Sequence, residues 1–148
     1  MKFQADEFGR LVITHHAASN AAGTDNGDTN SVDVSGFREA LVFYDYGTVD
    51  GPSPTPTIDV SVEDSADGTT FAAIAVSPAP VFAQRDGSVS PALNDLGYVG
   101  SIDLEQVRQF LRIVVVTAGI NQTYCAGMFL MHPKIAPAAQ VNTLEFRI

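Results

Sequence analysis

The chain has 148 residues, of which 45% are hydrophobic and 17% are charged, and its formal net charge is −9. This length and composition are typical of one globular domain with its own core, and they exclude an intrinsically disordered chain. Eight Lys and Arg residues are too few to hold a phosphate backbone, so we expect no nucleic acid as a partner. No apolar run is long enough for a signal peptide or a membrane helix, so we expect synthesis inside the cell and no membrane as a partner.

The first part of the chain shows little regular patterning. Residues 1–10 are polar and acidic and predict an extended N-terminal arm. Residues 11–14 form a short apolar run, which predicts the first strand. Residues 15–30 are rich in Ala, Ser, Asn, Gly, Thr and Asp without any period, so they predict a long loop. A short strand is expected at residues 31–34.

Residues 38–46, with the sequence REALVFYDY, predict a strong strand. Leu41 and Phe43 point to one face, and the other face is also apolar, with Ala40, Val42, Tyr44 and Tyr46. A strand that is apolar on both faces lies at the centre of its sheet or beneath a partner chain. Prolines in residues 47–56 then exclude that segment from a strand ladder.

Residues 57–74 carry the clearest hairpin pattern in the chain. Ile58, Val60 and Val62 alternate with polar residues, which predicts a strand with one buried face. Asp67-Gly68 predicts the turn, because glycine adopts positive φ angles at no steric cost. The chain is expected to return through Ile74 as a second strand, with the remaining strands laid against this hairpin.

The second half of the chain predicts further strands. A short strand is expected at residues 98–102, and Asp103 can cap a single helical turn after it. Residues 110–117, FLRIVVVT, predict a core strand. After a turn, residues 124–131 are expected to return antiparallel to it.

About eight short strands separated by turn signals predict the fold class. We expect an all-β, single-domain antiparallel β-sandwich, jelly-roll-like, with extended terminal segments. Residues 11–134 form the predicted sandwich domain, after the arm at 1–10. Residues 135–148 are expected to be a linker followed by a C-terminal strand, since Leu144, Phe146 and Ile148 alternate with polar residues.

Two groups of residues have the composition of a metal site but not its spacing. His15 and His16 are adjacent, so in a strand they point to opposite faces, and with the distant His132 they make a poor site. Residues 25–30, DNGDTN, offer oxygen ligands around a glycine, but no glutamate closes the loop where an EF-hand requires one. We expect no metal ion.

The acidic residues Glu63, Asp64 and Asp67 suggest a carboxylate pair for acid–base catalysis. They lie at a hairpin turn, where acidic residues are common, and nothing nearby in the sequence would separate their pKa values. No nucleophile elbow and no glycine-rich phosphate loop is present. The single cysteine, Cys125, has apolar neighbours that indicate a buried, inert thiol. We therefore expect neither an enzyme nor a cofactor.

Large apolar side chains exceed what one sheet face needs in its core, notably Phe43, Tyr44, Tyr46, Phe129 and Met131. Two interpretations remain open: central strands buried on both faces, or contacts between protomers, because aromatic and methionine side chains are enriched in interface cores. The interface candidates are Tyr44, Tyr46, Leu144, Phe146 and Ile148. We expect a homo-oligomer, with a trimer favoured over a dimer.

Three segments carry a resemblance to a known class of protein: SVDVSGFREALVFYDYGTVDG, TIDVSVEDSADGTTFAAI and VRQFLRIVVVTAGINQTYCAGMFLM. With these segments the chain resembles small virion proteins of tailed bacteriophages. In such proteins a run like V-D-V-S-G-F opens a strand, a hairpin of the form V-x-V-x-x-S-x-D-G-x-x-F follows, and R-x-F-L-R-I precedes the final hairpin.

The resemblance implies a jelly-roll-like head decoration (cement) protein that bridges neighbouring subunits of the major capsid protein and stabilises the shell. It implies synthesis in the host cytoplasm and a place on the capsid exterior in the virion. No catalytic residues come with the family. A second interpretation remains open, namely a carbohydrate- or receptor-binding β-sandwich module of a phage tail or fibre, although the absence of tryptophan counts against it.

Overall fold

The computed structural model describes residues 9–20, 23–27, 31–48, 57–75, 80, 82–86, 96–118 and 122–132. The strands in this part of the chain are β1 (Arg10–Asn20), β2 (Gly23–Asp25), β3 (Val32–Asp33), β4 (Glu39–Thr48), β5 (Thr57–Ser65), β6 (Ala72–Ala73), β7 (Arg85–Asp86), β8 (Leu96–Asp103), β9 (Phe110–Ala118) and β10 (Gln122–Met131). A short 3-10 helix, Leu104–Gln106, follows β8. Asp103 caps it by accepting a hydrogen bond from the Glu105 backbone, as its position in the sequence predicts.

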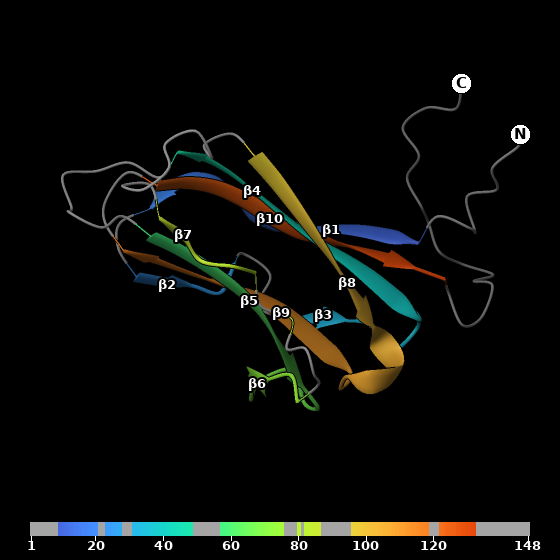
Figure 1. The fold of residues 1–148 in the computed structure, drawn as a ribbon. Helices are drawn as coiled ribbons and strands as arrows, with labels where there is room; N and C mark the ends of the chain where they lie inside the picture. Colours follow the sequence, from blue (N-terminus) through green and yellow to red (C-terminus); the bar gives the residue numbers. More distant parts are fainter. Residues whose placement is uncertain are drawn as a thin grey trace, which may run out of the picture.

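The strands form two antiparallel sheets that face each other (Figure 1). Sheet A has the strand order β1-β10-β4-β8. Sheet B has the order β2-β9-β5-β6, and β3 also pairs with β9 while β7 also pairs with β5. Buried apolar side chains from both sheets form one core cluster. The predicted all-β antiparallel sandwich is confirmed.

The pairing of the principal strands is nested. β1 pairs with β10, β2 with β9, β4 with β8 and β5 with β6, and every pair is antiparallel. Strands from the two ends of the chain therefore lie together, and strands from its middle close the series. This is the connectivity of a long hairpin rolled into two sheets, which is the jelly-roll arrangement.

The inner faces of four long strands make most of the core. These faces carry Ala40, Val42 and Tyr44 of β4, Tyr124, Ala126, Met128 and Leu130 of β10, Ile58, Val60 and Val62 of β5, and Leu111, Ile113 and Val115 of β9. The alternation read from the sequence assigns all of the β4, β5 and β10 residues in this set to shared faces, so the predicted strand phases are confirmed. β4 also lies between β10 and β8, as its two apolar faces indicate.

The loop predicted at residues 15–30 is wrong for much of its length. β1 continues to Asn20, and β2 follows at Gly23–Asp25. The register of β1 against β10 shifts between Ile13 and His15 and again before Ala18, and such irregularities remove the alternation by which a strand is recognised. The predicted arm at 1–10 is also too long, because Arg10 already pairs within sheet A.

The antiparallel return of β10 onto β9 is a second wrong prediction. The two strands lie in different sheets, so they do not pair with each other as a hairpin. A short connection between two apolar strands is compatible with both arrangements. β10 is instead placed between β1 and β4, which covers both of its edges.

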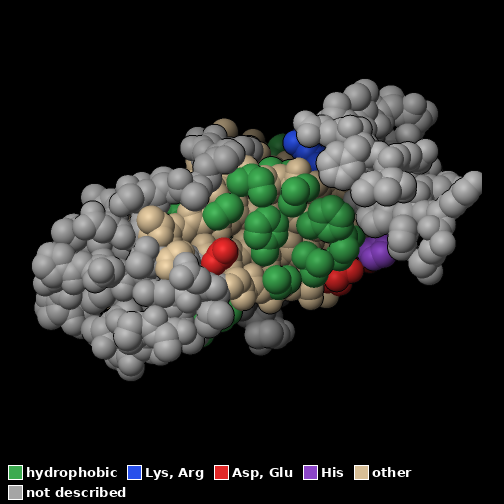
Figure 2. Space-filling view, turned by 90° about the horizontal axis from the view of Figure 1, so that it is seen from above, with side chains coloured by type: hydrophobic (Ala, Val, Ile, Leu, Met, Phe, Trp, Pro, Cys, Tyr) green, Lys and Arg blue, Asp and Glu red, His purple; other side chains and the backbone are tan. Residues whose placement is uncertain are grey.

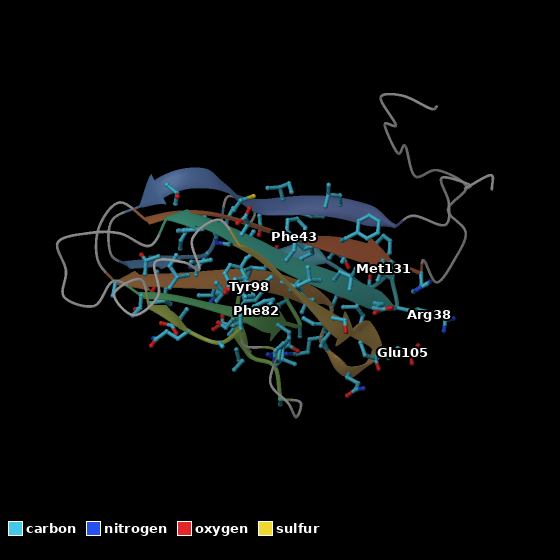
Figure 3. The ribbon with its side chains drawn as sticks, turned by 45° about the horizontal axis from the view of Figure 1, so that its top comes forward. Arg38, Phe43, Phe82, Tyr98, Glu105 and Met131 are labelled. Atoms are coloured by element: carbon cyan, nitrogen blue, oxygen red, sulfur yellow. The ribbon has the colours of Figure 1, made fainter. Side chains whose placement is uncertain are left out.

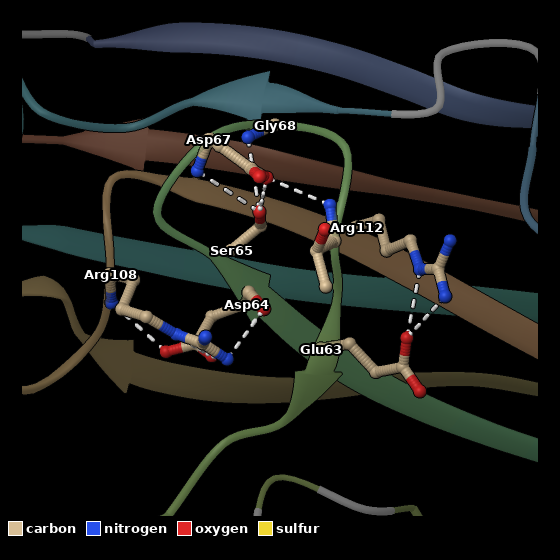
Figure 4. Close-up of polar contacts among 8 residues, drawn as sticks. Glu63, Asp64, Ser65, Asp67, Gly68, Arg108 and Arg112 are labelled. Carbon is tan, nitrogen blue, oxygen red and sulfur yellow. Dashed lines mark hydrogen bonds and ion pairs between the residues drawn. The ribbon is translucent and has the colours of Figure 1, made fainter.

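The turn predicted at Asp67-Gly68 is confirmed (Figure 4). Gly68 has a φ of 73°, and the Asp67 carboxylate accepts hydrogen bonds at 2.8 Å from the backbone N–H groups of Thr69 and Thr70. The Thr70 and Thr69 N–H groups hold the pKa of Asp67 well below its usual range. The returning strand is only the two-residue β6, so this hairpin lies at the edge of sheet B and does not organise the fold.

Candidate functional site

The outer face of sheet A is apolar across all four of its strands. The side chains of this surface, which we call the sheet A platform, are Leu11, Ile13, Leu41, Phe43, Val99, Phe129 and Met131. Strand register aligns Leu11 with Phe129 and Phe129 with Leu41, and the next row aligns Phe43 with Val99. Figure 2 shows hydrophobic side chains gathered over the middle of this face.

Water reaches much of the platform. Val99 is 67% exposed and Leu11 58% exposed, and the other members are half-buried. Single exposed apolar side chains are ordinary on protein surfaces, but a contiguous apolar patch marks an interaction site. Contact between rows of one sheet makes this patch contiguous, so the platform is the best candidate for a functional surface in the described part of the chain.

Gly127 of β10 lies at the centre of the platform, where there is no room for a larger side chain. The Cβ of a residue larger than glycine at position 127 would lie 2.5 Å from the Val12 carbonyl oxygen and 2.7 Å from Cζ of Phe43. The Phe43 ring thus occupies the space above β10, and the β1 backbone passes close beside it. Figure 3 shows Phe43 and Met131 on this sheet. The missing side chain at Gly127 therefore lets β1 and the Phe43 ring lie close to β10 at the centre of the platform.

Charged groups border the platform. Glu39 pairs with Met131 in the register, and its carboxylate lies 3.6 Å from Nε2 of His132. Asp45 is exposed at the other side and pairs with Cys125. Burial, with a smaller contribution from Asp45, raises the pKa of the Cys125 thiol, which therefore stays protonated at neutral pH. Cys125 is half-buried and not fully buried as the sequence indicates.

The outer face of sheet B has the opposite character. Asp59 accepts hydrogen bonds from the Gln84 amide at 2.8 and 3.0 Å. Arg112 pairs with Glu63 at 2.6 Å, and its guanidinium lies 4.4 Å from the centre of the Phe71 ring. These polar groups satisfy one another within the chain. The two faces of the sandwich are therefore not equivalent, and sheet A is the one suited to an apolar contact.

The interface candidates from the sequence have different outcomes. Tyr44 is a correction: it is 1% exposed and stacks between the sheets on Tyr98, so it offers nothing to a partner chain. Tyr46 lies in β4, but its side chain is outside the described residues. The C-terminal candidates Leu144, Phe146 and Ile148 also lie outside them.

The sequence analysis did not predict two exposed residues of the platform, Leu11 and Val99. Phe43, Phe129 and Met131 belong to the apolar surplus noted there, and two-sided apolar strands are the signal that found them. Leu11 and Val99 belong to short runs with no such signal, because only the sheet order shows that β1 and β8 flank β10 and β4.

Two of the histidines considered as metal ligands lie in different environments: His15 is buried and His132 is exposed. His15 is 2% exposed, with Nδ1 2.9 Å from the Thr14 hydroxyl and Nε2 3.3 Å from the Asp25 carbonyl oxygen. The Tyr124 hydroxyl donates to the Asp25 carboxylate at 2.7 Å. His132 is exposed just after β10. His15 is thus part of a partly buried polar network joining β1, β2 and β10, which the sequence does not reveal.

The candidate calcium loop is described only in part. In Asp25 one carboxylate oxygen accepts from the Gly27 N–H at 2.8 Å and the other from the Tyr124 hydroxyl of β10, so both have partners within the chain. Residues 28–30 lie outside the described part. Across the residues that the structure describes, no three or more His, Cys, Asp or Glu side chains are grouped so as to hold a metal ion.

The acidic residues considered for catalysis have structural partners (Figure 4). Asp64 is 5% exposed and accepts hydrogen bonds from the Arg108 backbone N–H at 2.9 Å and from its Nε at 2.7 Å. Glu63 pairs with Arg112, and Asp67 holds the turn. Hydrogen bonding to Asp64 raises the pKa of Arg108. Each carboxylate is therefore tied to the fold.

No protein family model matches the chain, and a search of curated proteins finds no match to its sequence. Within the described ranges no helix is long and apolar enough to cross a membrane.

Proposed function

We propose that this chain is a structural virion protein that decorates a phage capsid and docks through the sheet A platform. The platform is the observation that carries the proposal. An apolar surface carried by four paired strands is suited to contact with another folded protein, since burial of apolar area is the main favourable term in protein association. The jelly roll and the segment resemblance described above support the same assignment.

The proposed partner is the major capsid protein, with the chain bridging neighbouring subunits on the capsid exterior as a homo-oligomer. Each contact can be modest, because a repeating lattice presents many equivalent sites and linked contacts raise the overall affinity. The acidic chain, with a net charge of −9, binds through an apolar surface bordered by charge. The net negative charge disfavours non-specific association between copies, and the apolar face stays available for the capsid contact.

Quantitative mass spectrometry of purified virions tests the assignment. We expect a copy number comparable with that of the major capsid protein. A few copies per virion would instead support the tail or fibre module, and absence from virions would overturn the proposal.

A paired substitution tests the docking surface. Leu11→Glu places a charge on the platform, and Val116→Glu places one on the outer face of sheet B, where Val116 is 40% exposed. Because an unpaired charge is costly to bury, Leu11→Glu should weaken binding to undecorated capsids by at least about tenfold. Val116→Glu should bind like the unmodified chain. Equal loss in both variants, or in neither, would exclude the platform as the docking surface.

A further inference from the structure

The sheet A platform extends to the point where the described part of the chain ends. Met131 is the last residue of β10 and a member of the platform (Figure 3). Residues 133–148, which we call the tail, follow directly after His132 and lie outside the described residues. Among the described residues other than glycine, only His132 has a positive φ, of 54°. This left-handed residue ends the extended run of β10 and turns the chain out of its line.

The apolar side chains of the platform form rows that repeat at every second residue of each strand. Leu11 pairs with Phe129 in one row. Phe43 pairs with Val99 in the next row. Met131 lies two residues beyond Phe129 on β10, in a third row. Successive rows are about 7 Å apart, because two residues of a strand span that distance. The platform thus presents apolar side chains at three levels along its strands.

The tail carries apolar side chains with the same repeat. Leu144, Phe146 and Ile148 alternate with polar residues. In an extended segment these three side chains point to one side at a spacing of about 7 Å, and the polar side chains point to the other. The spacing of this apolar stripe therefore matches the spacing of the three platform rows. Packed on the platform, the stripe would face the sheet while the polar side of the tail faces water.

The tail is long enough to reach every part of the platform. Residues 133–143, which precede the apolar stripe, span up to about 36 Å when they are extended. Four strands at a spacing of about 4.8 Å make a sheet about 15 Å across, and the three rows extend over about 14 Å. A linker of this length holds the stripe at an effective concentration of about 1 mM beside its own platform. At micromolar protein concentration, contact within one chain is therefore favoured over contact with a second copy.

Charge favours the same contact. The tail contains Lys134 and Arg147 against one acidic residue, Glu145, in a chain whose net charge is −9. The tail is therefore opposite in charge to the rest of the chain and is attracted to it. At the border of the platform, Asp45 is exposed and the Glu39 side chain is 37% exposed, so negative charge is available to the tail there.

We propose that the tail of each chain folds back over its own sheet A platform and covers it in the free protein. The contact removes from water both the stripe and the exposed platform residues Leu11 and Val99. This inference rests on the proposed function in taking the platform as the capsid contact, and it adds the regulation of that contact. Tail and capsid compete for one surface, so the platform is shielded until an undecorated capsid displaces the tail.

A single tryptophan in the tail tests this contact on the isolated chain, without capsids. The chain contains no tryptophan, so Phe146→Trp introduces one fluorescent reporter at the centre of the apolar stripe. Its emission should lie at the shorter wavelength of a buried indole, and adding Leu11→Glu should shift it to the longer wavelength of an exposed one. Val116→Glu, on the outer face of sheet B, is the matched control and should leave the emission unchanged. Circular dichroism should show every variant folded.

The outcomes separate this inference from the proposed function. An exposed reporter in the Phe146→Trp chain, or the same emission with Leu11→Glu as with Val116→Glu, would exclude cover of the platform by the tail. A shift to longer wavelength on dilution from about 100 µM to about 1 µM would assign the cover to a second copy and overturn contact within one chain. A shielded reporter in a chain that is absent from virions would support the inference and overturn only the proposed function.

Discussion

Asp64 is an acidic residue on the inner face of a core strand. Its neighbours on that face of β5, Val60 and Val62, are apolar, and an unpaired carboxylate among them would be strongly disfavoured. Arg108 resolves this by donating both its backbone N–H and its guanidinium N–H groups to Asp64. Arg108 is half-exposed, so this pair closes the end of the core instead of lying deep within it. The carboxylate fixes where the segment before β9 meets the end of β5.

The Asp64 contacts give a prediction at the scale of one residue. Asp64→Asn keeps the shape of the side chain but removes its charge, so Arg108 loses its ionic partner. The free energy of unfolding should fall by about 1–3 kcal/mol, measured by urea denaturation. Asp59→Asn, on the outer face of the same strand, should cost less than about 0.5 kcal/mol. A loss of the same size in both variants would mean that the Arg108 contacts contribute no specific stability.

Individual strands were well predicted where alternation is regular. The sides of β4, β5 and β10 follow directly from the period of two in residues such as Val42, Val60 and Met128. β1 was cut short because its register shifts near His15 remove that period. β6 was overestimated because Ile74 is buried without belonging to a strand.

The partners of each strand could not be predicted in the same way. Residues facing the core are apolar whichever sheet holds the strand, so β9 and β10 look like a hairpin although they lie in opposite sheets. The exposed platform depends on this long-range strand order. Leu11 and Val99 belong to the same surface only because β1 and β8 lie in the same sheet. The candidate site was therefore visible in part, as an apolar surplus, but its extent was not.

Packing between β1 and β10 gives a prediction at the scale of the element. Gly127→Ala would place a Cβ 2.5 Å from the Val12 carbonyl oxygen, and one of the two strands must shift. The cost should be about 1–3 kcal/mol in the free energy of unfolding, as for other overpacked sites. Gly97→Ala in β8 is the control, since nothing lies within 4 Å of its Cβ position. If both variants unfold at the same urea concentration, the close approach of β1 has no energetic consequence.

In the described part of the chain, the outer face of sheet B is polar, the outer face of sheet A is apolar, and β8 is an edge strand of sheet A. The apolar face includes Met131, where β10 ends shortly before the tail. Cover by the tail and docking on the capsid therefore use the same surface of the molecule and exclude each other. A chain whose platform is open for only a fraction of the time binds more weakly by that fraction.

This competition predicts that the tail sets how tightly the chain binds undecorated capsids. Phe146→Glu places a charge within the apolar stripe, so the platform should be open in nearly every molecule. With about one platform in ten open in the unmodified chain, the variant should bind about tenfold more tightly, measured by cosedimentation with capsids. Thr143→Glu adds the same charge on the polar side of the tail and should bind like the unmodified chain. An equal gain in both variants would assign the effect to charge alone. If neither variant differs from the unmodified chain, the tail does not compete with the capsid, and cover and docking are separate properties of the molecule.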